Sequence, residues 1–308
     1  MMLHVLLLTV GFVFLVKGAD WFVEGAAGIA KKLGIPQLVI GLTIVAMGTS
    51  MTEAAVSITS ALSGSAGISI GNVVGSNILN ILIILGITAV LTNVRIQKTT
   101  FRYEIPFMIG ITIILMAFGI TGNQIPFLEG ILFWLLFLIF LGYLFVISKK
   151  GSVQDEEEIK ELPLWKGVLG IIIGGILVVK GSDFAVEGAT EIARYFGMSE
   201  RFIGLTIVAF GTSLPELVTS VTAARRGNAD IAIGNIVGSN IFNILFVIGT
   251  TALICNVPFD QKFVIDTIVA IFSGVLLWAG TIRYKELRKN CGIVMLLCYA
   301  GYFIYLCR

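Results

Sequence analysis

The stretch GLTIVAMGTSMTE at residues 41–53 returns almost unchanged as GLTIVAFGTSLPE at residues 204–216. A shift of 163 residues superposes the two halves of the chain without a gap, and 28 of 46 positions are identical between residues 41–86 and residues 204–249. Polar positions match as well as apolar ones, so shared hydrophobicity does not account for the agreement. The chain therefore contains an internal repeat, and the two halves are structural equivalents.

The composition places this repeat in a membrane. Of the 308 residues, 57% are hydrophobic and only 13% are charged, and the mean hydropathy is +0.98. A soluble domain carries roughly a quarter charged residues, which argues against an aqueous globular enzyme. The 21 Lys and Arg residues are scattered between apolar runs, so there is no basic cluster for nucleic acid. The sequence predicts a polytopic integral membrane protein.

Apolar runs long enough to cross a bilayer, which takes about 20 residues, recur ten times. The predicted spans are residues 2–30, 36–62, 68–91, 104–120, 126–147, 164–195, 201–224, 230–254, 263–281 and 291–307. With the N-terminus outside, fifteen Lys and Arg residues fall in cytoplasmic loops, and only four fall in outer loops or at the C-terminus. This positive-inside bias and the even number of spans predict a multi-pass protein of the cell membrane with both termini extracellular.

The spans form two groups of five, residues 1–147 and residues 164–308, joined by an acidic cytoplasmic linker at residues 148–163. Five is an odd number, so the second group must enter the membrane from the opposite side. We therefore expect an all-α integral membrane protein with ten transmembrane helices in two inverted five-helix repeats and broken helices at the midplane. The linker is expected to be a solvated connection.

A glutamate occupies the middle of an apolar span in each half, at Glu53 and Glu216. A carboxylate at the bilayer centre costs about 2.5–3.5 kcal/mol, so two acids at equivalent positions indicate a function more than a structural hydrogen bond. Each acid follows Gly-Thr-Ser, and Pro215 also removes a backbone donor, so both spans are expected to break just before the acid. The break is expected to free inward-pointing carbonyls, those of Ala46, Met47, Thr49, Ala209, Phe210 and Thr212.

Hydroxyl and amide side chains accompany both acids. Four hydroxyls lie three or four residues before a glutamate and are expected on the helix face of that acid, namely Thr49, Ser50, Thr212 and Ser213. The third and eighth spans add a stripe with a spacing of four, formed by Asn72, Ser76, Asn80, Asn235, Ser239 and Asn243. Such residues commonly serve helix packing. Opposite a carboxylate, we expect cation ligation by Ser76, Asn80, Ser239 and Asn243.

The candidate ligands are all oxygen atoms, which favours a hard cation. Calcium accepts six to eight oxygen ligands in loose geometry, whereas magnesium prefers a tight octahedron. The same oxygens could hold sodium ions, so occupancy by sodium and by calcium can be mutually exclusive, and exclusive occupancy with alternating access makes an antiporter. The single histidine, His4, is at the N-terminus, and the four cysteines show no metal-type spacing, so zinc, copper and haem sites lack their ligands. No cofactor is expected.

A charged stripe precedes the glutamate in each half. Lys17, Asp20 and Glu24 follow a helical spacing, and Lys180, Asp183 and Glu187 repeat it. Pairing of lysine with aspartate would lower the cost of both charges near a membrane interface. We interpret the stripe as structural or gate-related, in preference to ion ligation.

Taken together, Gly48-Thr49-Ser50-Met51-Thr52-Glu53 and Gly211-Thr212-Ser213-Leu214-Pro215-Glu216, each followed by Gly-Asn-x-Val-Gly-Ser-Asn-Ile-x-Asn, resemble the two alpha repeats of the cation/calcium exchanger superfamily, in its prokaryotic sodium/calcium exchanger branch. The resemblance covers almost the whole chain. It implies exchange of extracellular sodium for intracellular calcium, with the first and sixth helices sliding against the other eight. The implied ion ligands are Thr49, Ser50, Glu53, Ser76, Asn80, Thr212, Ser213, Glu216, Ser239 and Asn243, with the carbonyls of Ala46 and Ala209 as sodium ligands.

Two residues depart from that pattern. Thr52 stands where the family usually has proline, so the break before Glu53 is expected to be softer than the break before Glu216, or closed by the Thr52 amide. Asn243 stands where several relatives have aspartate, which sets the formal charge of the site at two negatives and resembles potassium-independent exchangers.

The leading hypothesis is a sodium/calcium antiporter that works by alternating access. The alternative on the same scaffold is an exchanger of protons for calcium or another cation, because a glutamate can carry a proton. An intramembrane acid hydrolase would use paired carboxylates but gains nothing from duplicated Thr, Ser and Asn residues. A passive channel would dissipate a gradient without a counter-ion. The expected partners are the lipid bilayer and the transported cations, with no nucleic acid and no obligatory protein partner.

Overall fold

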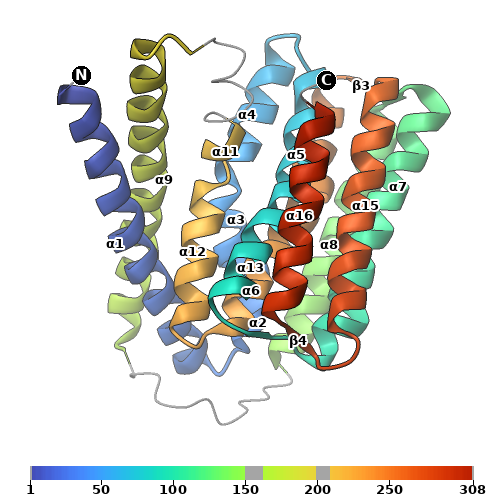
Figure 1. Ribbon diagram of the computed structural model, residues 1–308. Coiled ribbons are helices and arrows are strands. Elements are labelled where there is room, and N and C mark those ends of the chain that lie inside the picture. Colours follow the sequence, from blue (N-terminus) through green and yellow to red (C-terminus); the bar gives the residue numbers. More distant parts are fainter. Residues whose placement is uncertain (1, 150–161, 199–208, 307–308) are drawn as a thin grey trace.

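The computed structural model describes residues 2–149, 162–198 and 209–306 of the chain, and almost all of them are helical (Figure 1). The α-helices are α1 (Met2–Leu33), α2 (Gln37–Ile40), α3 (Ala46–Thr49), α4 (Met51–Leu62), α5 (Gly67–Leu79), α6 (Gly86–Leu91), α7 (Ile105–Gly122), α8 (Phe127–Lys149), α9 (Leu164–Tyr195), α11 (Ala209–Gly211), α12 (Leu214–Arg225), α13 (Ala229–Phe242), α14 (Gly249–Ile254), α15 (Gln261–Thr281) and α16 (Lys289–Leu306). Four π-helical turns continue them, η1 (Gly41–Val45), η2 (Asn80–Leu85), η3 (Thr100–Glu104) and η5 (Asn243–Ile248).

Within the described residues, eight helical spans are long and apolar enough to cross a membrane. A ninth is obtained if the bent pair Gln37–Thr49 and Met51–Leu62, whose parts meet at 48°, counts as one span. The chain is thus a multi-pass membrane protein. The seventh predicted span, residues 201–224, lies partly outside the described residues, and only α11 and α12 represent it. Most of the predicted linker, residues 150–161, also lies outside them.

Two spans fill the interior of the helix bundle. Most residues of the span from α5 to α6, and nearly all residues of the span from α13 to α14, are buried. The helices around them expose Leu, Ile, Val and Phe side chains, as a lipid-facing surface requires. Each interior span widens into a π-helical turn at an asparagine, Asn80 in η2 and Asn243 in η5. Such turns occur frequently at functional sites.

Helices α1 and α9 pack side by side along their length (Figure 1). Glycines allow their backbones to touch, because a Cβ atom at Gly18 would lie 2.8 Å from the Gly174 carbonyl oxygen, and one at Gly25 would lie 2.6 Å from the Gly167 carbonyl oxygen. Residue numbers rise along α1 while those of the contacting residues fall along α9, so the two helices are antiparallel. Close backbone approach through small residues is the usual means of helix association in lipid.

The charged stripe of α1 has a partner on another helix. Arg226, which follows α12, reaches Asp20 at 2.8 Å and Glu24 at 3.3 Å. In α9 the equivalent Asp183 pairs within its own helix, with Lys180 at 3.2 Å. In α1, Asp20 thus pairs with Arg226, where the sequence predicted a lysine partner, and the structural or gate-related role of the stripe stays a prediction.

Four two-residue strands were not expected from the sequence. Strand β1 (Val94–Arg95) pairs antiparallel with β4 (Glu286–Leu287), and β2 (Gln124–Ile125) pairs antiparallel with β3 (Val257–Pro258). Each pair joins a loop of the first half to a loop of the second half. These strands are too short to show an alternating pattern, which explains why the sequence analysis missed them.

Alanine at Gly174 is expected to force α1 and α9 apart. A Cβ atom there would lie 2.5 Å from the Phe22 backbone nitrogen and 2.7 Å from the Gly18 carbonyl oxygen. Overpacking of this kind costs about 1–3 kcal/mol, so Gly174→Ala should lower the melting temperature of the purified protein in detergent. Gly110→Ala is the matched control, because no atom lies within 4 Å of a Cβ atom at Gly110. Equal melting temperatures for the two variants would contradict the close α1–α9 contact.

Candidate cation site

Both breaks lie immediately before a glutamate, as the sequence predicts. Helix α3 ends at Thr49 and α4 begins at Met51, so Ser50 alone forms the first break. The second break is longer, since α11 ends at Gly211 and α12 begins at Leu214. The first break, which precedes Thr52, is therefore the shorter of the two, and its softness stays a prediction.

Each glutamate lies in the first turn of the helix that follows its break. The first turn of a helix carries partial positive charge from unpaired backbone N–H groups, which stabilises a carboxylate. Both side chains are completely buried, with 0% exposed surface for Glu53 and for Glu216. Helix polarity thus offsets part of the cost of placing these two charges inside a membrane protein.

The hydroxyls before the breaks contact the opposite half of the chain. Ser50 donates to Oε1 of Glu216 at 2.9 Å, and Thr49 donates to Oδ1 of Asn235 at 3.0 Å. The expectation that Thr49 and Ser50 share a helix face with Glu53 is wrong, because the helix ends between them and the acid. Glu53 instead accepts a bond at Oε2 from its neighbour Thr52 at 2.9 Å.

The expectation of a freed Ala46 carbonyl is also wrong. Its oxygen accepts the Ser50 backbone N–H at 3.0 Å and the Ser239 hydroxyl at 3.4 Å. The Phe210 carbonyl likewise accepts a backbone N–H. The breaks are short enough for turn hydrogen bonds to close over them.

Asn72 and Asn235 tie each interior span to its own broken helix. The Asn72 amide donates to the Ser57 hydroxyl at 2.9 Å and to the Glu53 carbonyl at 3.1 Å. Asn235 repeats both bonds, to Ser220 at 2.9 Å and to the Glu216 carbonyl at 3.4 Å. These amides hold the glutamate backbones in place, a role distinct from that of a ligand.

A reciprocal network of four asparagines joins α5 to α13. Asn77 and Asn240 each donate to the other's backbone carbonyl, at 3.2 Å and 3.1 Å. Asn80 donates to Oδ1 of Asn240 at 3.0 Å, and Asn243 donates to Oδ1 of Asn77 at 3.2 Å. Asn77 and Asn240 are not among the ligands predicted from the sequence. Their repeated position three residues before Asn80 and Asn243 was the available signal.

Five buried oxygen atoms near the breaks and the network have no hydrogen-bond partner. They are Oε1 of Glu53, Oε2 of Glu216, Oδ1 of Asn80, Oδ1 of Asn243 and Oγ of Ser213. Among the described residues, neither Glu53 nor Glu216 forms a salt bridge. Buried carboxylates and acceptors without donors are costly, and bound cations are one kind of partner that can offset this cost.

The other predicted ligands lie around these atoms. The Ser76 side chain is buried and interacts with Glu53, and the Thr212 carbonyl oxygen lies 3.2 Å from the Thr52 hydroxyl. Ala209 is the first residue of α11. In the described part of the chain no three His, Cys, Asp or Glu side chains gather as a metal cluster. A cation here would depend on two carboxylates with neutral oxygens, a donor set that suits calcium and sodium.

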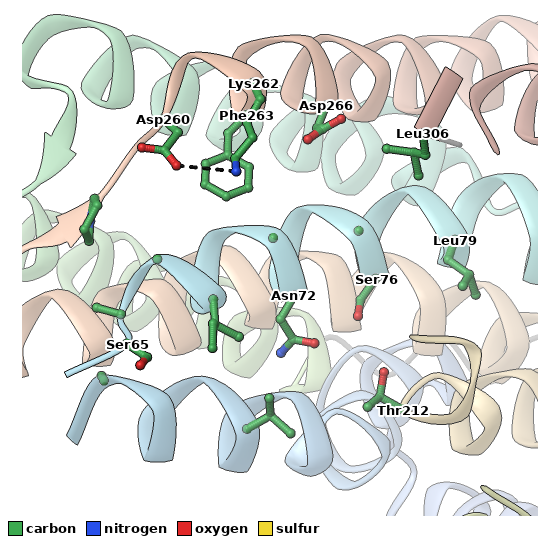
Figure 2. Close-up of a pocket in the computed structure, with 18 of the residues that line it drawn as sticks. Ser65, Asn72, Ser76, Leu79, Thr212, Asp260, Lys262, Phe263, Asp266 and Leu306 are labelled. Carbon is green, nitrogen blue, oxygen red and sulfur yellow. Dashed lines mark ion pairs between the residues drawn. The ribbon is translucent and has the colours of Figure 1, made fainter. Parts of the chain in front are cut away.

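A crevice of about 1040 Å³ extends from the candidate site between α4, α5, α15 and α16 (Figure 2). Asn72 and Ser76 lie on its α5 wall, and Thr212 lies at its inner end. Its outer part contains Asp260 and Lys262, which pair at 3.7 Å. Its lining includes the loop between α4 and α5, the start of α15 and the last turn of α16, which lie at the end of the bundle that carries the N-terminus of α1 and the C-terminus of α16 (Figure 1). Ser76 therefore borders both the crevice and Glu53.

Comparison with known proteins assigns the family. The sequence model described as "Sodium/calcium exchanger protein" matches residues 3–146 and 166–308, which is nearly the whole chain. These proteins are membrane transporters that exchange cations. The chain belongs to the sodium/calcium exchanger family.

Relatives with similar sequences extend over the full length of the chain. The chain is 38% identical to the putative antiporter CaxA of Alkalimonas amylolytica, with 98% of each protein covered. It is 32% identical to the sodium/calcium exchanger MaX1 of Methanosarcina acetivorans, with 98% of this chain and 97% of that protein covered. A solved structure of the sodium-calcium exchanger NCX_Mj superposes with a TM-score of 0.86 at 33% identity, over 99% of this chain and 98% of that one.

Removal of the Asn77 amide is expected to weaken cation binding. Asn77→Ala leaves the Asn243 amide without its acceptor and removes one of the two reciprocal bonds between α5 and α13. Loss of a group that orients a ligand typically costs 10–100-fold in metal affinity, so we expect roughly that loss in calcium affinity, measured by isothermal titration calorimetry. Asn93→Ala, in an exposed loop, is the control. Unchanged affinity in a folded Asn77→Ala variant would show that the network does not support the site.

Proposed function

We propose that this protein is an antiporter that moves calcium across the cell membrane in exchange for sodium. The observation that carries the proposal is the group of five unpartnered, buried oxygens, two of them carboxylate oxygens from opposite halves of the chain. Two negative charges balance one calcium ion or two sodium ions. If the site holds either calcium or sodium, but never both together, the movement of calcium in one direction is coupled to the movement of sodium in the other.

The proposed ligands are those of the sequence analysis, with roles sharpened by the contacts. Glu53, Glu216, Asn80, Asn243 and Ser213 present oxygens without partners. The remaining members complete the coordination in one or another loading state and are Ala46, Thr49, Ser50, Ser76, Ala209, Thr212 and Ser239. Sodium and calcium are the transported substrates in this proposal.

The proposed topology is ten spans in two inverted repeats, residues 1–147 and residues 164–308, with residues 148–163 as a cytoplasmic linker. The antiparallel packing of α1 on α9 and the reciprocal bonds between α5 and α13 support a two-fold relation. The positive-inside bias supports extracellular termini. The crevice then opens toward the extracellular side.

Neutralising either carboxylate is expected to abolish exchange. Sealed vesicles loaded with sodium and diluted into sodium-free buffer should take up calcium. Glu53→Gln and Glu216→Gln should each lower that uptake by at least about 100-fold, since each removes half of the charge that holds the cation. Glu104→Gln is the matched control, because Glu104 is as deeply buried but bonds Tyr143, away from the site.

The same vesicles separate the competing functions. Full uptake by both glutamate variants would refute the assigned role of the carboxylates. Calcium uptake driven by a pH gradient without sodium would identify a proton exchanger, and flux without any counter-ion would identify a channel.

A cysteine in the crevice is expected to make transport sensitive to reagents from one side. Gly71 lines the crevice, and a Cβ atom there meets only the Phe263 ring, at an ordinary 3.5 Å. In a variant without native cysteines, Gly71→Cys should lose most of its uptake when a cationic, membrane-impermeant thiol reagent is added outside. Gly142→Cys on α8 should not respond. Inhibition of Gly71→Cys from the inside alone would reverse the proposed orientation.

A further inference from the structure

Thr52 breaks the equivalence of the two halves at the candidate site. The repeat places Thr52 opposite Pro215, which has no hydroxyl. The Thr52 hydroxyl lies 2.9 Å from Oε2 of Glu53, 3.3 Å from the Thr49 carbonyl oxygen and 3.2 Å from the Thr212 carbonyl oxygen. It therefore touches an acid of its own half and the break of the other half.

The serines of the two breaks differ as a result. Ser50 donates its proton to Glu216 at 2.9 Å. Its repeat equivalent, Ser213, would be the corresponding donor to Glu53, but the Ser213 oxygen is buried and has no partner. The position of the hydroxyl donor to Glu53 is taken by Thr52 instead.

We propose that Thr52 is a positioning residue that fixes Glu53 by one carboxylate oxygen and leaves Oε1 of Glu53 and Oγ of Ser213 to the calcium ion. A hydroxyl has one proton, and among the three acceptors around Thr52 the carboxylate forms the strongest bond because it carries charge. The inference rests on the proposed function, because it assigns a role in binding the transported cation.

Fixing one oxygen has a chemical consequence for the site. A carboxylate held at Oε2 offers a calcium ion a single oxygen in a set direction. A carboxylate free to rotate must be ordered by the ion itself, which lowers affinity. Ser213 contributes in the same arrangement, since its proton is not required by Glu53.

Two substitutions at Thr52 test the proposal by calcium titration of the purified protein in sodium-free buffer. Thr52→Val keeps the shape of the side chain and removes the hydroxyl, and it should weaken calcium binding about 10-fold. Thr52→Ser restores the hydroxyl and should bind calcium within about 3-fold of the unsubstituted protein. Equal calcium affinity for Thr52→Val and the unsubstituted protein, or an equal loss in the Ser and Val variants, would overturn the proposal.

A double-mutant cycle with Ser213 supplies a readout that a packing defect would not move. In Thr52→Val the Ser213 hydroxyl can turn to Glu53, so Ser213→Ala should cost several-fold more calcium affinity in that background than in the unsubstituted protein. Additive effects would contradict the proposal. Ser63→Ala, at an exposed helix end, should combine additively with Thr52→Val.

The titration also separates this inference from the proposed function. If the folded, unsubstituted protein does not bind calcium, the proposed function fails and the role of Thr52 fails with it. If it binds calcium and only the Thr52 expectations fail, the exchanger assignment stands and the positioning role is wrong. The melting temperature of each variant shows whether it is folded.

Discussion

Two carboxylates without a protein counter-charge, buried between the halves of a membrane protein, are the constraint on which the rest of the structure depends. In a low-dielectric interior such charges are tolerated only if polar groups and ions surround them. The fold meets part of this demand with helix N-termini, since Glu53 and Glu216 both lie in the first turn after a break. In the proposed function the remainder is supplied by the transported cations, so binding of a cation is expected to stabilise the site.

The surrounding network gives those charges a fixed frame. Asn72 and Asn235 hold the backbone of each glutamate, and Asn77 and Asn240 lock the two interior spans together. The π-helical turns at Asn80 and Asn243 begin where the network ends. The amide nitrogens of these asparagines donate hydrogen bonds within the protein, whereas Oδ1 of Asn80 and Oδ1 of Asn243 have no hydrogen-bond partner.

The sequence predicted the membrane class, both helix breaks and the two buried acids, because hydropathy and an internal repeat report these features directly. It could not predict that Ser50 reaches Glu216, since spacing along a helix applies only while the helix continues. The partners of Ala46 were hidden for a related reason, because a carbonyl freed from one helix can be captured by a turn or by a neighbouring span. Asn77 and Asn240 are repeated in both halves, but the spacing of four that selected their neighbours does not include them.

The glycine contacts between α1 and α9 imply that these helices behave as one mechanical element. The backbones approach closely at Gly18 and Gly174, and again at Gly25 and Gly167. A shift of one helix along the other would bring bulkier neighbouring residues into these contacts. Because one helix comes from each half, a rigid displacement of α1 against the rest of the bundle would carry α9 with it.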